Sequence, residues 1–83
     1  MIIRTRTKEE FIKLLEIYKS KNWIWYGLHL IEETDENLWD NYKEETALEY
    51  NDKFTFGRYK SYSNHEIVSF NIFFRKNKIK KLL

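Results

Sequence analysis

The chain contains no cysteine and no proline, and it has only two glycines, Gly27 and Gly57. Without cysteine it can form neither a disulfide nor a thiolate zinc site, so a hydrophobic core has to hold the fold alone. Two isolated glycines also exclude the glycine-rich loops that cradle phosphates. Aromatic residues are abundant instead, with three Trp, six Tyr and six Phe. At 83 residues, the chain is expected to form one domain around an aromatic core.

The chain also lacks a long apolar segment. A membrane-spanning helix needs about 20 apolar residues, and no such run is present. The segment Met1–Arg6 does not have the apolar stretch of a signal peptide. We therefore expect a cytoplasmic protein that does not enter a membrane. The abundance of Lys, Asn, Ile, Tyr and Phe is typical of A/T-rich genomes and favours a bacterial or phage source.

The charged residues are segregated along the chain. Residues 1–22 carry six basic and three acidic groups, residues 23–52 carry one basic and nine acidic groups, and residues 53–83 carry eight basic and one acidic group. The formal net charge of +2 hides this pattern. Segregated charge creates local fields that steer association with a partner of opposite charge. Alternatively, the acidic and basic segments neighbour one another in the fold and neutralise each other.

The first residues predict a strand followed by a helix. Ile2–Arg6 alternates apolar and polar residues, as a half-buried strand does. Thr7 and Glu10 have the spacing of a capping box, in which the Thr7 hydroxyl binds the backbone of Glu10 and the Glu10 carboxylate returns to the backbone of Thr7. The helix is expected to end before Trp23. Its apolar stripe, which is expected to face the core, consists of Phe11, Leu14, Leu15 and Tyr18.

Strand-like segments follow this helix. Trp23–Ile31 is rich in β-prone residues, with both faces expected to be at least partly covered and Gly27 marking a bulge or a close approach. The segments 46–50 and 53–57 are predicted to form a hairpin, because the Asn51–Asp52 pair between them tolerates the left-handed backbone of a tight turn.

The end of the sequence completes the predicted fold. Alternating apolar residues from 68 to 74 indicate a further strand, and Leu38–Tyr42 is expected to form a short helical turn or an ordered loop. The predicted fold class is α+β, with a mostly antiparallel sheet of four to five strands and one N-terminal amphipathic helix packed on one face. Residues 1–75 form the single domain of this prediction, and residues 76–83 form a basic C-terminal tail.

No motif indicates a catalytic or metal site. Glycoside hydrolysis needs two carboxylates held apart across a cleft, and no spacing among the acidic residues selects such a pair. His29 and His65 are the two imidazoles, and neither belongs to a metal-binding or nucleophile motif. We therefore expect a protein that is not an enzyme and that needs neither a cofactor nor a metal.

The acidic segment and the two rings that follow it form the candidate partner-binding site. Trp39 and Tyr42 are three residues apart and share one side of a helical turn. Aromatic side chains beside charge are typical of protein-binding hot spots. The alternative is structural, with solvated loop carboxylates and two rings that fix the loop to the sheet. The candidate residues are Glu32, Glu33, Asp35, Glu36, Trp39 and Tyr42.

The basic tail offers a different candidate. Its lysines could bind phosphates, and Trp25, Tyr59 or Tyr62 could stack on bases. The simpler interpretation of such a tail is that it keeps the protein in solution. A third possibility is a dimer in which exposed rings pair across a two-fold axis. The candidate nucleic-acid-binding residues are Lys76, Lys78, Lys80 and Lys81.

Several segments together resemble a group of small phage and prophage accessory proteins. These proteins have a strand, a T/S-KEE-F helix, an aromatic strand, a W-x-x-Y-x-x-x-T segment and a closing hairpin. This chain departs from the group after the aromatic strand, where Leu30–Glu33 replaces glycine and proline. The matching segments are Thr7–Phe11, Lys21–Trp25, Trp39–Thr46 and Tyr62–Phe70.

The resemblance implies a function as well as a fold. Anti-CRISPR proteins are phage-encoded binders of similar size, so the resemblance implies a non-catalytic inhibitor of a host defence complex. Its partner would be a host protein, namely a CRISPR effector nuclease, with type VI effectors among the candidates, or the guide complex of that nuclease. The inhibitor would block its target by occupying it.

Overall fold

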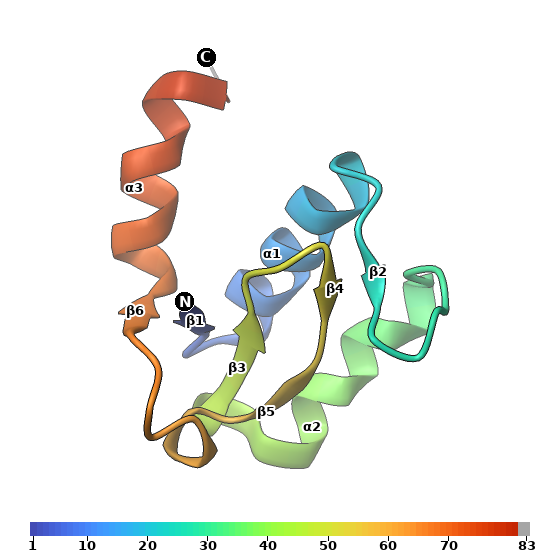
Figure 1. Ribbon diagram of the computed structural model, residues 1–83, viewed down its shortest axis with the longest axis horizontal. Helices are drawn as coiled ribbons and strands as arrows, with labels where there is room; N and C mark the ends of the chain where they lie inside the picture. Colours follow the sequence, from blue (N-terminus) through green and yellow to red (C-terminus); the bar gives the residue numbers. More distant parts are fainter. Residues whose placement is uncertain (82–83) are drawn as a thin grey trace.

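The computed structural model describes the backbone of residues 1–81 and the side chains of residues 1–76 (Figure 1). Its α+β class, its mostly antiparallel four-stranded sheet and its N-terminal helix confirm the predicted fold class. The helices are α1 (Lys8–Ser20), α2 (Trp39–Tyr42) and α3 (Phe70–Lys81), and short 3-10 turns lie at Glu33–Leu38, Lys43–Glu45 and Tyr59–Ser61. The strands are β1 (Ile2–Arg4), β2 (Ile24–Trp25), β3 (Thr46–Glu49), β4 (Lys53–Phe54), β5 (Phe56–Arg58) and β6 (Ile67–Ser69).

The main sheet has the strand order β5-β3-β1-β6, and a small second sheet joins β2 to β4. β1 pairs antiparallel with β3, where Ile3 lies opposite Leu48, and parallel with β6, where Ile3 lies beside Val68. Ile2 and Ile3 are completely buried, because β1 lies inside the sheet. Segments from the two ends of the described chain are therefore neighbours at the centre of the fold (Figure 1).

Helix α1 begins where the sequence predicts. Thr7 Oγ1 accepts a hydrogen bond from the backbone N–H of Glu10 at 3.2 Å, which satisfies one free donor of the first turn. The returning contact differs from the prediction, because the Glu10 carboxylate accepts from the backbone N–H of Arg6 at 2.8 Å and not from that of Thr7. The predicted apolar stripe of α1 is confirmed as core: Phe11, Leu14, Leu15 and Tyr18 are all buried.

The end of α1 also lies where the sequence predicts. Asn22 adopts a left-handed conformation with φ of 62°. The backbone N–H of Asn22 donates to the carbonyl of Lys19, and that of Trp23 donates to the carbonyl of Tyr18, each at 3.0 Å. These two bonds form a Schellman motif, whose usual apolar contact is here the packing of Trp23 on Tyr18 with ring centroids 5.0 Å apart. The helix end therefore directs the following segment onto the core.

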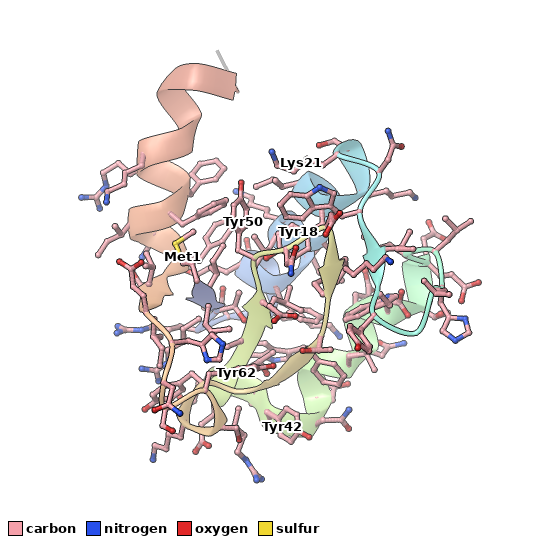
Figure 2. The ribbon with its side chains drawn as sticks, in the orientation of Figure 1. Met1, Tyr18, Lys21, Tyr42, Tyr50 and Tyr62 are labelled. Carbon is pink, nitrogen blue, oxygen red and sulfur yellow. The ribbon has the colours of Figure 1, made fainter. Side chains whose placement is uncertain are left out.

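Aromatic rings form much of the core, as the composition predicts. Tyr18 packs edge-on against Phe54, with ring centroids 4.6 Å apart. Phe54 in turn contacts Trp25, with ring centroids 4.5 Å apart. Figure 2 shows Tyr18 beside Tyr50, with ring centroids 5.9 Å apart. The Tyr18 hydroxyl donates to the Glu49 carbonyl at 2.8 Å, which satisfies the one polar group of this buried ring. Burial raises the pKa of the Tyr18 phenol well above its usual value.

The predicted hairpin of 46–50 and 53–57 forms, but its second arm is divided between two sheets. β5 pairs antiparallel with β3, and β4 pairs in parallel with β2. The connection is also different from the predicted left-handed turn, because neither Asn51 nor Asp52 has a positive φ. Instead, Asn51 Oδ1 accepts from the backbone N–H of Asp52 at 2.8 Å, an interaction that holds a wider turn.

The predicted strand over residues 68–74 is wrong after Ser69, where α3 begins. Phe70 and Phe73 are buried, whereas the Ile72 side chain is 48% exposed, so burial follows a helical spacing and not an alternating one. Ser69 Oγ accepts from the backbone N–H of Ile72 at 3.4 Å, as a helix-capping residue does. The backbone of α3 continues into the segment from residue 76 onward.

Candidate functional site

The acidic segment and the basic C-terminal helix lie far apart in the molecule. In Figure 1, α3 is at one end of the long axis, and the 3-10 turn Glu33–Leu38 is at the other end, beyond β2. Among the described side chains one ion pair forms, between Arg58 Nε and Glu45 Oε1 at 3.4 Å. No ion pair among the described side chains joins the 3-10 turn to α3, and the carboxylates of the turn form an acidic surface.

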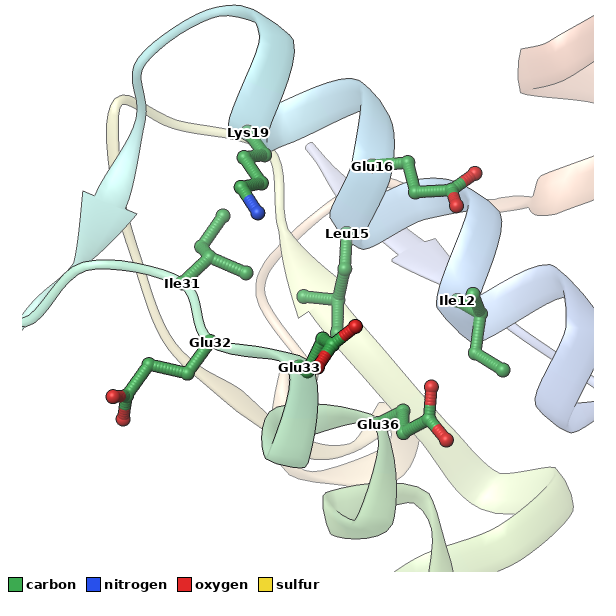
Figure 3. A pocket seen from close by; sticks show the side chains of 8 residues that line it. All are labelled: Ile12, Leu15, Glu16, Lys19, Ile31, Glu32, Glu33 and Glu36. Carbon is green, nitrogen blue, oxygen red and sulfur yellow. The ribbon is translucent and has the colours of Figure 1, made fainter.

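This acidic surface surrounds an open pocket of about 230 Å³ between α1 and the segment 31–36 (Figure 3). Figure 3 shows the Glu33 and Glu36 side chains pointing toward α1, whereas Glu32 points away from the helix. One cation, Lys19, stands among the carboxylates. We call this site the acidic pocket. Its apolar lining is Ile12, Leu15 and Ile31, and its charged rim is Glu16, Lys19, Glu32, Glu33 and Glu36.

Asp35 holds one wall of the acidic pocket in place. Its Oδ2 atom accepts two hydrogen bonds at 2.8 Å, from the indole Nε1 of Trp25 and from the backbone N–H of Glu32. The backbone N–H of Asp35 also donates to the Glu32 carbonyl at 3.0 Å. Asp35 is half-buried and already engaged, so its part in the site is to position the neighbouring carboxylates.

The two predicted aromatic anchors are not free surface rings. Trp39 is only 8% exposed and packs in the core beside Phe11, with ring centroids 6.3 Å apart. Tyr42 is half-buried, because its ring lies against Phe56 at 5.7 Å and the Arg58 guanidinium covers it at 4.9 Å. The contacts of both rings agree with the structural alternative, in which Trp39 and Tyr42 fix the segment to the rest of the fold.

The structure thus brings Glu32, Glu33 and Glu36 together and adds Glu16 from α1. The sequence carries a signal for this addition, because Ile12, Glu16 and Lys19 recur at i, i+4 and i+7 and share one face of the helix. The sequence does not indicate which segment of the chain packs beside that face of the helix. The acidic 3-10 turn packs beside α1 only through tertiary contacts.

The predicted strand Trp23–Ile31 is short, and it ends in a feature that sequence reasoning missed. Only Ile24–Trp25 pairs as a strand. The residues that follow turn outward and are exposed, so the expected partial cover of both faces ends at Trp25. The exposed fractions are 69% for Tyr26, 68% for Leu28 and 76% for Leu30. These side chains are large, apolar and adjacent to the acidic pocket in the chain.

The alternative basic site is only partly described. The side chain of Lys76 is exposed on α3, whereas those of Lys78, Lys80 and Lys81 lie outside the described residues. The three rings considered for base stacking already have other contacts: Arg4 covers the ring of Tyr59 at 4.0 Å, the Tyr62 hydroxyl lies 3.3 Å from Thr55 Oγ1, and Trp25 packs on Phe54.

Among the described side chains, no three His, Asp or Glu residues gather where they could hold a metal ion. Within the described part of the chain, no helix is both long and apolar enough to cross a membrane. Comparison with known proteins gave no match to a family model, to a curated protein or to a solved structure. The resemblance to small phage accessory proteins therefore stays a prediction.

Proposed function

We propose that this chain is a non-catalytic inhibitor that binds a basic surface of another protein through the acidic pocket. The observation that carries the proposal is the composition of that pocket, an apolar floor surrounded by Glu16, Glu32, Glu33 and Glu36. With the single cation Lys19 among four carboxylates, the pocket is acidic as a whole.

An arginine or lysine side chain is the group that fits this composition. Its aliphatic stem can lie on Leu15 and Ile31, while its charged end reaches the carboxylates at the rim. The rim is exposed to solvent, where charge pairs are weak individually but accelerate association and fix orientation. The pocket therefore supports recognition of a basic partner more than a large gain in affinity.

The partner in this proposal is a host defence nuclease. A CRISPR effector holds its guide and target strands in positively charged channels, and such a channel presents the arginine and lysine side chains that the acidic pocket would bind. A protein seated in the channel blocks the nuclease by occupancy and needs no catalysis. This part of the proposal depends on the resemblance to anti-CRISPR-like phage proteins, and it places the action in the cytoplasm of a bacterial host.

The experiment is a tagged pull-down from a bacterial lysate that contains CRISPR effectors, with and without nuclease treatment, followed by binding and cleavage assays with each purified effector. The test variant combines Glu32→Gln, Glu33→Gln and Glu36→Gln. The control variant makes the same change in charge elsewhere on the surface, at Glu9→Gln, Glu44→Gln and Asp52→Asn.

We expect an effector to remain bound after the nucleic acid is destroyed. We also expect the test variant to lose inhibition while the control variant keeps it. The proposal fails if both variants bind every effector as the unchanged protein does, because the acidic pocket would then have no part in recognition.

A second candidate function is nucleic-acid binding through α3. The observation in its favour is the position of Arg75 and Lys76, which are exposed on a helix at the opposite end of the molecule from the acidic 3-10 turn (Figure 1). Affinity should then fall steeply with salt, because phosphate contacts release counterions. Replacing the four lysines of the tail with glutamine should abolish binding. A salt-insensitive affinity, or recovery of a protein partner after nuclease treatment, contradicts this candidate.

A further inference from the structure

A tight turn follows β2 and has an unusual residue at its critical position. The Leu28 N–H donates to the Trp25 carbonyl at 2.8 Å, and the Trp25 N–H donates to the His29 carbonyl at 3.0 Å. This is the bonding of a three-residue hairpin loop, in which the third residue is left-handed and is usually glycine. Here that residue is Leu28, with φ of 67°, while Gly27 stands one position earlier. The backbone at Leu28 is therefore strained.

The same leucine is also largely exposed to solvent, at 68%. Tyr26 and Leu30 beside it are exposed to a similar degree. We call residues 26–30 the apolar turn. Large apolar side chains gathered on a surface mark binding sites more often than single exposed ones do. Folding gains little from the placement of Leu28, because the side chain buries little apolar surface and glycine would relieve the strain.

The apolar turn is held firmly. The Tyr26 N–H donates to the Phe54 carbonyl at 2.8 Å at one end of the turn. Within it, the His29 ring lies so close to Gly27 that a Cβ there would be 3.1 Å from Cδ2 of the ring. The Trp25–Asp35 hydrogen bond fixes the strand that leads into the turn. A rigid protrusion loses little conformational entropy on binding, which favours its use as a contact surface.

We infer that the apolar turn is a second contact for the same partner and that it inserts into an apolar depression bordered by basic side chains. The inference rests on the proposed function and adds the chemistry of the partner surface. The apolar turn leads directly through Ile31 into Glu32 and Glu33, and Ile31 lines the acidic pocket. The two features are therefore consecutive in the chain and share Ile31 as their junction.

Charge decides between a different protein and a second copy of this chain. A two-fold dimer through the apolar turn would bring Glu32 and Glu33 of one copy close to those of the other, and like charges repel at such an interface. A partner with basic side chains around an apolar depression matches both parts of the surface. In that arrangement the carboxylates control the association rate, and the apolar turn controls the dissociation rate.

The test uses a fluorescent helical peptide with leucines on one face and arginines on the other as the probe. One control peptide replaces each leucine with serine, and another replaces each arginine with glutamine. The probes are titrated by fluorescence anisotropy into the unchanged protein, Leu28→Gly, the pair Tyr26→Ser with Leu30→Ser, and the Glu32, Glu33 and Glu36 glutamine variant. Ile72→Ser, at an exposed apolar side chain on α3, is the matched control.

We expect Leu28→Gly to bind the leucine–arginine peptide about tenfold more weakly, since it loses one buried apolar contact. Its affinity for the serine control peptide should not change. Leu28→Gly should also unfold at a higher denaturant concentration than the unchanged protein, because glycine relieves the strain at this position. Weaker binding by a more stable protein cannot be attributed to unfolding. Ile72→Ser should bind all three peptides normally.

The other outcomes separate the two proposals. If the turn variants bind normally and the glutamine variant binds weakly, the inference about the apolar turn is overturned and the proposed function stands. If the turn variants bind weakly but neither the glutamine variant nor loss of the arginines has an effect, the basic partner is wrong, and with it the proposed function. If molar mass rises with concentration for the unchanged protein and not for Leu28→Gly, the partner of the apolar turn is a second copy.

Discussion

The indole Nε1 of Trp25 donates a hydrogen bond to Oδ2 of Asp35 at 2.8 Å. This bond joins β2, which leads into the apolar turn, to the 3-10 turn that borders the acidic pocket. The same oxygen accepts the backbone N–H of Glu32. A carboxylate that accepts two hydrogen bonds where it is half-buried is costly to remove, since its donors lose their partner. Asp35 is thus a positioning residue of the proposed surface.

Replacing Asp35 with alanine should therefore lower the free energy of unfolding by about 2–3 kcal/mol. Urea denaturation followed by circular dichroism measures this change. Glu33→Ala is the control, because Glu33 is exposed and its replacement should change stability by no more than about 0.5 kcal/mol. Equal stability of the two variants would show that the Asp35 bonds do not hold the segment.

Trp39 is expected to matter for stability and not directly for binding. Its burial beside Phe11 predicts a loss of about 3–5 kcal/mol for Trp39→Ala. This loss could unfold so small a domain, so Trp39→Phe serves as the milder variant. Thermal denaturation of Trp39→Ala and Trp39→Phe measures the loss of stability, and Tyr42→Ala serves for comparison. The prediction is contradicted if the Trp39→Ala protein has normal stability but does not bind its partner, because Trp39 would then contribute directly to binding.

Lys43 occupies a backbone conformation that suits glycine. Its φ of 49° and ψ of −124° match the first central position of a type II′ turn. Lys43→Gly should raise the free energy of unfolding by about 1 kcal/mol, because the strain of a side chain at this position is relieved. Its neighbour Glu44 has no positive φ, so Glu44→Gly should lower stability by up to about 1 kcal/mol. Guanidinium denaturation of both variants tests the contrast.

Alkaline pH should weaken the fold through Tyr18. Burial raises the pKa of this phenol above its ordinary value of 10.0, so the folded state keeps the proton that the unfolded state releases. The stabilisation is complete below pH 10 and is lost as pH rises above it. Tyr18→Phe should cost about 1 kcal/mol at neutral pH through the lost bond to the Glu49 carbonyl. It should also reduce the fall in stability above pH 10, which parallel urea titrations can measure.

The sequence predicts helix α1 in detail because each of its signals is local. The Thr7 cap, the apolar stripe and the residues of the C-terminal turn lie within a few positions of one another. The main sheet was predictable only in class. The pairing of β1 with β6 joins residues from opposite ends of the described chain, and no local pattern encodes such a pairing.

Residues 68–74 show why one local pattern misleads. Val68, Phe70, Ile72 and Phe74 alternate as a strand does, whereas Phe70, Phe73 and Phe74 have the spacing of a helix. Both patterns are present, and the core selects the second by burying Phe70 and Phe73. Ser69 was the available signal, because a serine before an apolar run often caps a helix.

The candidate site was predictable in charge but not in shape. Glu32, Glu33 and Glu36 belong to an evident acidic segment, whereas the pocket also needs Glu16 and Ile12 from α1. The exposure of Leu28 was hidden for a different reason. A leucine in a β-prone run predicts burial, and only the hydrogen bonds of the turn show that the chain reverses at this residue.

The position of β1 inside the sheet has a consequence for synthesis. β1 leaves the ribosome before both of its partner strands. The strand that carries the buried Ile2 and Ile3 therefore has no partner on one of its edges until β6 has been synthesised after β3. Until then the strand presents unpaired backbone groups next to two large apolar side chains, a combination that promotes association between chains. Slow translation of the segment between β3 and β6 should therefore increase aggregation of the nascent protein, whereas rapid translation of that segment protects it.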